Sequence, residues 1–129
     1  MPQRDLLLVA MLLLPALSWG QSQGFVQDAR GTAVRAACQA TLDRMQNKEV
    51  TTHAQQQSSY CFGMVEGLIT MHKTATLRGL EPLFCVPDSV TVEQGISVIV
   101  AWLNRHTDQL EQPGSALLVQ ALQDSYPCQ

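Results

Sequence analysis

The sequence predicts an all-α fold, a small bundle of four main helices stapled by two disulfides. Apolar side chains recur every three to four residues in four separate segments, which is the period of a helix that buries one face. Capping and turn-forming residues separate these segments. The chain also has four cysteines, an even number that would supply two cross-links.

The chain begins with a segment typical of a secretory signal peptide. MPQRDLLLVAMLLLPALSWG has a charged start at Arg4, an apolar run at 6–14 and a small-residue exit. Ser18 and Gly20 provide the small side chains expected before a cut, so we expect cleavage after Gly20. The apolar run is too short to span a bilayer comfortably, which favours cleavage over an uncleaved anchor. We therefore expect an exported protein, located in the periplasm.

Removal of residues 1–20 leaves enough chain for one compact domain and no room for a second. We expect residues 21–31 to form a flexible lead-in and residues 32–129 to form the helical domain. The formal net charge is −3, and no basic patch suggests a nucleic-acid partner. Beyond the leader no segment approaches transmembrane length, so we expect no membrane association after cleavage.

The first helix is expected to begin at Thr32. Its apolar and small side chains fall at helical spacing and place Cys38 on the inward face. These residues are Val34, Ala37, Cys38, Thr41, Leu42 and Met45. The next stretch, residues 46–59, is polar and breaks this pattern, so a surface connection is expected there.

The second helix is expected to start at a cap formed by Ser58 or Ser59, which puts Cys61 in its first turn. Cys61 also lies on the apolar face of this helix, so its side chain should point inward. Gly63 and Gly67 form a GxxxG pair, which costs about 1 kcal/mol of helix propensity per glycine but lets another helix approach closely. We interpret this pair as a site of tight helix packing.

The third and fourth helices follow segments rich in turn-forming residues. Residues 77–90 contain a glycine and two prolines, which prevent regular structure. TVEQ at 91–94 has the form of a capping box, and apolar residues recur from there at helical spacing to about Arg105. These features favour a helix over the strand that the run ISVIV would suggest. A polar turn, 106–114, leads to the last helix, which is expected to end near Tyr126.

The four cysteines are interpreted as two disulfides, because exported compartments oxidise thiols. They are Cys38, Cys61, Cys85 and Cys128. No CxxC or HxxxH pair supports a zinc site, so we expect neither a metal nor a cofactor. Neighbouring antiparallel helices favour Cys38–Cys61 with Cys85–Cys128. The pairing of Cys61 with Cys85 and of Cys38 with Cys128 is the second choice.

A catalytic thiol at Cys61 is the competing interpretation. A helix N-terminus lowers the pKa of a thiol, and His53, His72 or His106 would have to act as the base. However, Cys61 lies on an apolar face, a second inward cysteine is available to it, and no third orienting residue can be named. The acidic residues are scattered and form no catalytic pair. We therefore expect no enzymatic activity.

Three motifs lie in order along the mature chain: YCFGMVEG at 60–67, FCVPDSVTVEQ at 84–94 and ALLVQALQDSYPC at 116–128. Together they resemble the Tai/Rap family, immunity proteins against peptidoglycan amidase toxins of type VI secretion systems. The resemblance runs from about Thr32 to Cys128. The sequence departs from the family pattern at Met64, where an aromatic residue is usual, and at His106-Thr107, where His-Pro is usual.

The resemblance implies an exported, disulfide-bonded inhibitor, often a homodimer, which binds a peptidoglycan amidase toxin and plugs its substrate cleft. Residues that contact the toxin vary between such proteins, so only exposed loops can be nominated from this sequence. The first candidate is the turn at 106–112, with His106, Asp108, Glu111 and Gln112 as partner-binding candidates. The second candidate is the loop at 77–83.

A different class of function remains open from the sequence. A periplasmic acid-stress or general chaperone-like protein without a cognate toxin would also be small, helical, exported and disulfide-bonded. Such a chaperone should expose apolar surface and come apart at low pH. An immunity protein should stay folded and bind one partner tightly.

Overall fold

The computed structural model describes residues 29–129, so the predicted signal peptide and most of the predicted lead-in lie outside the described residues. No β-strand occurs between residues 29 and 129, and the predicted all-α class with four main helices is confirmed. The helices are α2 (Gly31–Met45), α3 (Thr52–Leu77), α4 (Val92–Arg105) and α5 (Gly114–Ser125), with a short 3-10 helix, η2 (Thr107–Gln109), before α5.

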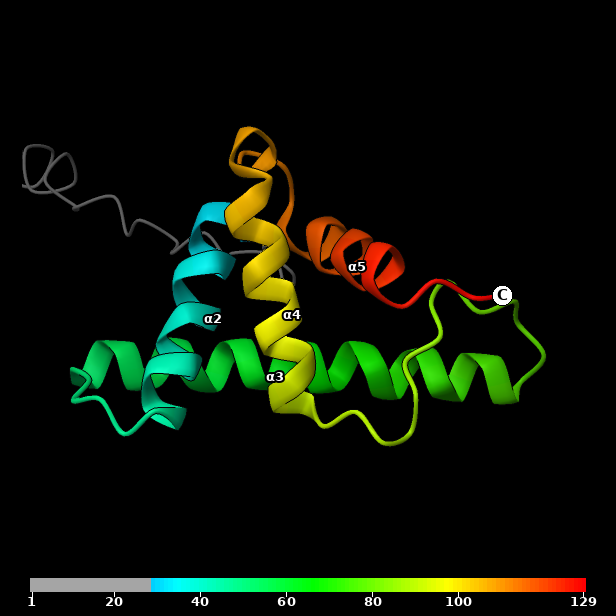
Figure 1. The fold of residues 1–129 in the computed structure, drawn as a ribbon, viewed down its shortest axis with the longest axis horizontal. Coiled ribbons are helices and arrows are strands. Elements are labelled where there is room, and N and C mark those ends of the chain that lie inside the picture. The colour runs from blue at the N-terminus through cyan, green and yellow to red at the C-terminus, as the bar shows by residue number, and fades with distance from the viewer. Residues whose placement is uncertain (1–28) are drawn as a thin grey trace, which may run out of the picture.

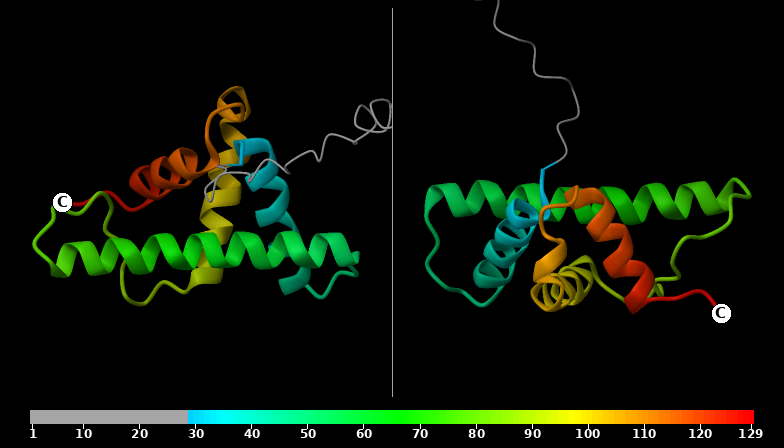
Figure 2. Two further views of the ribbon diagram at one scale, coloured as in Figure 1. Left: turned by 180° about the vertical axis from the view of Figure 1, so that it is seen from behind. Right: turned by 90° about the horizontal axis from the view of Figure 1, so that it is seen from above.

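The long helix α3 lies along one side of the molecule, and the other described helices lie against it or above it (Figure 1). Helices α2 and α4 cross α3 instead of running along it, and α5 packs on α4 and α2. Seen from above, the three shorter helices all lie on one side of α3 (Figure 2). In the described part of the chain, no helix combines the length and apolarity needed to cross a membrane.

The core lies where the four helices meet. The start of α4 is fixed by the predicted capping box: Thr91 Oγ1 accepts a hydrogen bond from Gln94 N at 3.2 Å, and Gln94 Oε1 accepts one from Thr91 N at 2.9 Å. This register turns the apolar face of α4 inward. The largest fully buried side chains include Trp102, Ile96, Ile99, Leu103, Leu117, Leu118, Leu122, Val34 and Val65.

Helix α3 begins earlier than the sequence predicted. Its cap is Thr51, whose hydroxyl accepts a hydrogen bond from Ala54 N at 3.2 Å, so the predicted connection at 46–59 is wrong from Thr52 onward. Ser58 is buried in the second turn, where its carbonyl accepts a bond from the Thr41 hydroxyl at 3.2 Å. Packing against α2 therefore extends the helix through a polar segment, and Cys61 lies well inside α3 and not in its first turn.

The close helix packing predicted at Gly63 and Gly67 is not found within the described chain. Both glycines are exposed, and a Cβ atom added at either would meet nothing within 4 Å. Close approach occurs instead at Gly31 and Gly114, which begin α2 and α5. A Cβ at Gly114 would overlap Val34 Cγ2 and lie 2.6 Å from Ala29 O.

Replacing Gly114 with alanine is expected to lower the free energy of unfolding by about 2 kcal/mol, because the new methyl group overpacks the junction with α2. Thermal unfolding measures this as a fall in Tm of about 10 °C. Gly95→Ala is the matched control: its methyl group is also added inside a helix, but the nearest atom is Ile69 Cδ1 at 3.9 Å, an ordinary contact, so Tm should not fall. Equal Tm values for Gly114→Ala and the wild type would contradict this packing.

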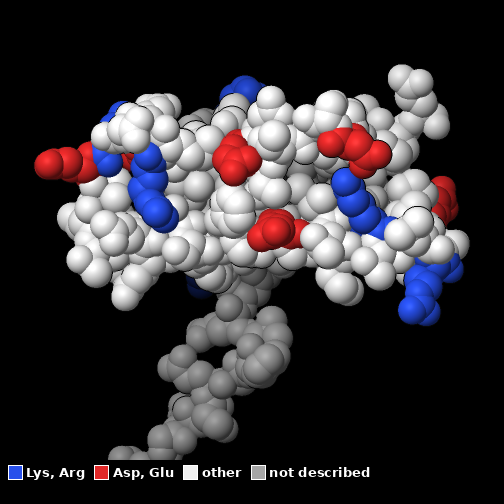
Figure 3. All heavy atoms as spheres, turned by 90° about the horizontal axis from the view of Figure 1, so that it is seen from below, with Lys and Arg blue, Asp and Glu red and all other residues white. Residues whose placement is uncertain are grey.

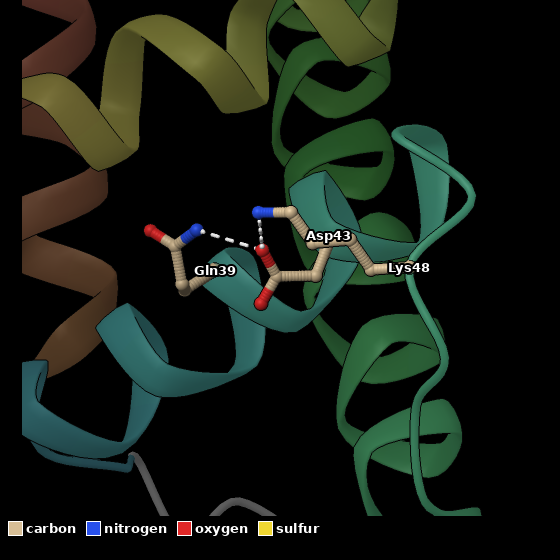
Figure 4. Close-up of polar contacts among 3 residues, drawn as sticks. All are labelled: Gln39, Asp43 and Lys48. Atoms are coloured by element: carbon tan, nitrogen blue, oxygen red, sulfur yellow. Dashed lines mark hydrogen bonds and ion pairs between the residues drawn. The ribbon is translucent and has the colours of Figure 1, made fainter.

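The last turn of α2 is closed by a polar cluster on Asp43 (Figure 4). Lys48 Nζ donates to Asp43 Oδ1 at 2.9 Å, and Gln39 Nε2 donates to the same oxygen at 3.3 Å. These hydrogen bonds, first that of Lys48 and then that of Gln39, lower the pKa of Asp43. Asn47 follows with a φ of 56° and turns the chain out of the helix.

The pKa of Asp43 is expected to lie below its ordinary value in the folded protein and to return toward it in Lys48→Ala. Because the folded pKa is lowered, this carboxylate stabilises the fold at pH values above its unfolded pKa of about 4. It is lost as the pH falls through the folded pKa. An NMR titration of the Asp43 carboxyl carbon measures this pKa in the wild type and in Lys48→Ala. Equal midpoints in the two would contradict the role of Lys48.

Candidate partner-binding surface

The two disulfides have the pairing that the sequence favoured. Cys38 of α2 is bonded to Cys61 of α3, and Cys85 is bonded to Cys128 near the C-terminus. Cys38 and Cys61 are both 0% exposed, so this bridge is part of the core and not a reactive thiol site. Among residues 29–129, no group of three His, Cys, Asp or Glu side chains could hold a metal ion.

The C-terminal half of α3 and the loop that follows it carry an exposed apolar surface. Met71, Leu80 and Leu83 are 68%, 64% and 59% exposed, and together they are called the distal patch here. They border a hollow of about 460 Å³ that Leu68, Ala75 and Phe84 also line. Exposed apolar side chains that gather in this way are typical of an interaction site, whereas single ones are ordinary.

The segment between α3 and α4, residues 78–91, passes over this end of α3 and is called the strap here (Figure 1). Phe84 anchors the strap: its side chain is 1% exposed, and its ring stacks on that of His72 with centroids 3.9 Å apart. A His72 Nε2 to Phe84 O hydrogen bond of 2.8 Å fixes the main chain at the same point. Nearer α4, Lys73 Nζ lies 3.0 Å from Asp88 Oδ1.

A second hollow, of about 430 Å³, lies on the other side of this anchor. Its lining includes Ile69, Leu77 and Cys85, and it shares His72 and Phe84 with the first hollow. Leu77, at the end of α3, is 88% exposed. The strap therefore presents apolar groups on both sides of a fixed anchor, which reduces the ordering that binding would require.

Charged groups are dispersed on the face of the molecule drawn in Figure 3. Acidic and basic side chains are interspersed among uncharged atoms, and no broad area of one sign covers this face. Such a surface offers little electrostatic steering to a highly charged partner. The hollow at the distal patch is lined mainly by apolar side chains, with Glu81 as its acidic residue, so apolar contact is the stronger physical basis for recognition there.

The turn at 106–112, the first candidate from the sequence, is largely engaged within the chain. The His106 ring stacks on Trp102 with centroids 3.9 Å apart, and its Nδ1 lies 2.8 Å from Trp102 O. Glu111 forms an ion pair with Arg30. Asp108 and Gln112 are exposed.

The main chain of the same turn is attached to the start of α2. Leu110 O accepts a hydrogen bond from Thr32 N at 3.1 Å, and Gln112 O accepts one from Gly31 N at 3.0 Å. The side chain of Leu110 is buried in the core. This turn therefore organises the N-terminus of α2, which gives His106 and Glu111 roles that require no partner.

The second candidate loop, 77–83, supplies Leu80 and Leu83 to the distal patch. Sequence reasoning missed Met71, because it lies off the apolar stripe that was read along this helix. Its position in the sequence could have identified it, because it is an apolar residue on the polar side of a helix and close to a loop with several leucines.

A family model described as Rap1a immunity proteins matches residues 24–128. The match covers every described residue except Gln129, and it includes both disulfides and the distal patch. A comparison with curated proteins found no match, and a comparison with solved structures found none either.

Proposed function

Since the chain belongs to the Rap1a immunity protein family, we propose that it is a periplasmic protein that binds and blocks a peptidoglycan amidase toxin delivered by type VI secretion. The family match is the observation that carries this proposal: an immunity protein protects its cell by binding a secreted toxin. The predicted signal peptide and the two disulfides support a periplasmic location, where thiols are oxidised.

The distal patch is the surface proposed to contact the toxin. Met71, Leu80 and Leu83 lie on a strap and helix end that extend beyond the crossing of α3 with α2 and α4 (Figure 1). Apolar side chains in such a position can enter the mouth of a cleft on another protein. Fully burying one of them contributes about 1.5–3 kcal/mol, so the three together would supply an apolar centre of about 4.5–9 kcal/mol, to which the surrounding contacts add.

Inhibition by this route requires no chemistry from the immunity protein. A bound helix end would occupy the space that the peptide part of peptidoglycan needs, so the toxin's own reactive groups would remain intact but unreachable. The affinity would come from apolar contact at the patch, with Glu81 at the rim of the hollow available for a polar contact.

A homodimer is a further part of the proposal. Gly63 and Gly67 are exposed on α3, and a Cβ atom added at either would meet nothing within 4 Å. Two such helices can approach closely where glycines replace larger side chains. Light scattering during size-exclusion chromatography should then give twice the mature chain mass, and Gly67→Arg should give the single mass.

Survival of cells that export both proteins tests the function. The full chain is co-expressed with candidate amidase toxins targeted to the periplasm, and viable counts are compared with those from a vector control. Protection is expected against the cognate toxin. A variant without residues 1–20 is the control for location, because it should remain in the cytoplasm and fail to protect. Full protection by that variant would contradict the periplasmic site, and no protection by the full chain against any amidase would contradict the function.

The chaperone interpretation keeps one observation in its favour, because a chaperone also exposes apolar surface such as the distal patch. The two functions differ in stoichiometry and specificity. An immunity protein should bind one toxin in a saturable complex at neutral pH. A chaperone should suppress the aggregation of several unrelated denatured proteins, and should do so mainly after acidification.

A further inference from the structure

The two disulfides differ in their accessibility to a reductant in solution. Cys38 and Cys61 are 0% exposed, enclosed between α2 and α3. Cys85 and Cys128 are both exposed, in the strap and in the segment after α5. Thiol–disulfide exchange requires a thiolate to approach a sulfur atom, so access determines which bridge can react in the folded protein. Only Cys85–Cys128 meets this condition.

The exposed bridge joins segments that have few other links to each other. Residues after α5 have no regular structure, and beside the disulfide a Cys85 N to Tyr126 O hydrogen bond of 2.7 Å connects them to the strap. No core residue follows Leu122, since Tyr126 is only partly buried. Loss of the disulfide would therefore free the C-terminal segment without opening the core.

The same bridge lies next to the proposed toxin contact. Leu83 and Phe84 immediately precede Cys85, and Phe84 lines both hollows at the end of α3. With the disulfide formed, the strap is held at its middle by Cys85 as well as by Phe84 and His72. Without it, the strap would keep the buried Phe84 side chain with its His72 contacts and the packing of Val86. On either side of these, it would keep only the Cys85 N to Tyr126 O hydrogen bond and the exposed Lys73–Asp88 ion pair, and exposed ion pairs contribute little.

We propose that Cys85–Cys128 is a reducible clasp that orders the strap and so controls binding at the distal patch, while Cys38–Cys61 stays oxidised and maintains the fold. The second part of this inference rests on the proposed function, because it assigns the patch to toxin binding. The first part, selective reduction and loosening of the strap, stands without any toxin.

The reaction is a two-electron exchange with a dithiol reductant. One thiolate of the reductant attacks the sulfur of Cys85 or Cys128, and the other cysteine leaves as a thiolate that takes a proton from water. The second thiolate of the reductant then attacks the mixed disulfide. The products are two cysteine thiols on the protein and one disulfide in the reductant.

Native-state reduction with dithiothreitol tests the clasp in the oxidised, signal-cleaved protein. Samples are quenched with an alkylating reagent, and the four cysteine-containing peptides are quantified by mass spectrometry. Cys85 and Cys128 are expected to be labelled at least 10-fold faster than Cys38 and Cys61, with the circular dichroism of the helices retained. Equal labelling of all four cysteines, or no labelling without denaturant, would overturn the inference.

Hydrogen exchange then reports the strap directly. Amides of residues 78–91 are expected to exchange at least 10-fold faster after selective reduction, while those of α2 and α4 keep their rates. Cys85→Ser with Cys128→Ser should reproduce this pattern without reductant. Unchanged strap exchange in both the reduced protein and the variant would overturn the clasp.

Binding to a toxin identified by the survival test separates the two proposals. The reduced protein is expected to bind at least 10-fold more weakly than the oxidised one. Equal affinities would overturn the control of binding. If neither form binds any amidase, the proposed function fails, and the labelling and exchange results still decide the clasp.

Discussion

Replacing Leu80 and Leu83 together with aspartate is expected to weaken binding of the cognate toxin by at least about 100-fold. Each leucine should contribute about 1.5–3 kcal/mol when a partner covers it, and about 1.4 kcal/mol corresponds to a tenfold change in Kd. The aspartates would also bring two charges into the contact without partners. Because these leucines are 64% and 59% exposed in the free protein, the fold should be unaffected.

Isothermal titration calorimetry with the purified toxin measures the loss, and thermal unfolding confirms that the variant is folded. Met45→Asp is the control for an aspartate at an exposed apolar position outside the patch, with one added charge where the double variant has two; Met45 is 44% exposed at the end of α2. This control should bind as tightly as the wild type. A double variant at 80 and 83 with wild-type affinity would remove the distal patch from the toxin contact.

Replacing Cys38 and Cys61 together with alanine is expected to lower the free energy of unfolding by about 5 kcal/mol. About 3 kcal/mol comes from the loss of the constraint on the unfolded chain. The rest comes from removing two sulfur atoms that are 0% exposed, which leaves a cavity between α2 and α3. For a domain of this size such a loss is a large part of the total stability.

Urea unfolding at neutral pH measures this loss, with Cys85→Ala and Cys128→Ala together as the matched control. The control bridge spans 43 residues and the core bridge 23, so chain entropy alone predicts a slightly larger effect for the control. Burial predicts the reverse, with a control loss of no more than about 4 kcal/mol. A larger loss in the control would show that the core bridge stabilises the fold mainly through chain entropy.

Those features of the fold that depend on local sequence were predictable. The capping box of Thr91 and Gln94, the inward stripe of α4 and the inward position of both core cysteines all follow from spacing and side-chain chemistry. The disulfide pairing followed because helices that are neighbours in sequence pack against each other. The start of α3 could not be predicted from the sequence, because its polar first turns are stabilised by contact between Ser58 and α2.

The close contacts between helices could not be predicted from the sequence, because they depend on which helix faces meet in the fold. GxxxG at Gly63 and Gly67 is a helix-packing pattern, yet both glycines are exposed and no described helix approaches within 4 Å of an added Cβ atom. The glycines that do permit close approach, Gly31 and Gly114, are far apart in the sequence and show no pattern. Their importance follows only from the meeting of the first turns of α2 and α5.

The candidate site was predictable in part. The loop at 77–83 was nominated as an exposed segment, and the structure adds Met71 from α3 and shows how His72 and Phe84 hold the strap. The turn at 106–112 is the first candidate from the sequence because it is an expected exposed loop whose Asp108 and Glu111 could complement charges in a cleft. Sequence alone could not show that Glu111 pairs with Arg30 or that His106 stacks on Trp102, because both contacts require the folded chain.

This protein is proposed to recognise its toxin through the distal patch. Amide hydrogen exchange, measured with and without the toxin, tests this proposal most directly. Exchange is compared between the free protein and the protein with saturating toxin. Protection is expected at residues 68–84, the C-terminal half of α3 and the first half of the strap, with little change at 106–112. Protection confined to 106–112, with residues 68–84 unchanged, would contradict the account.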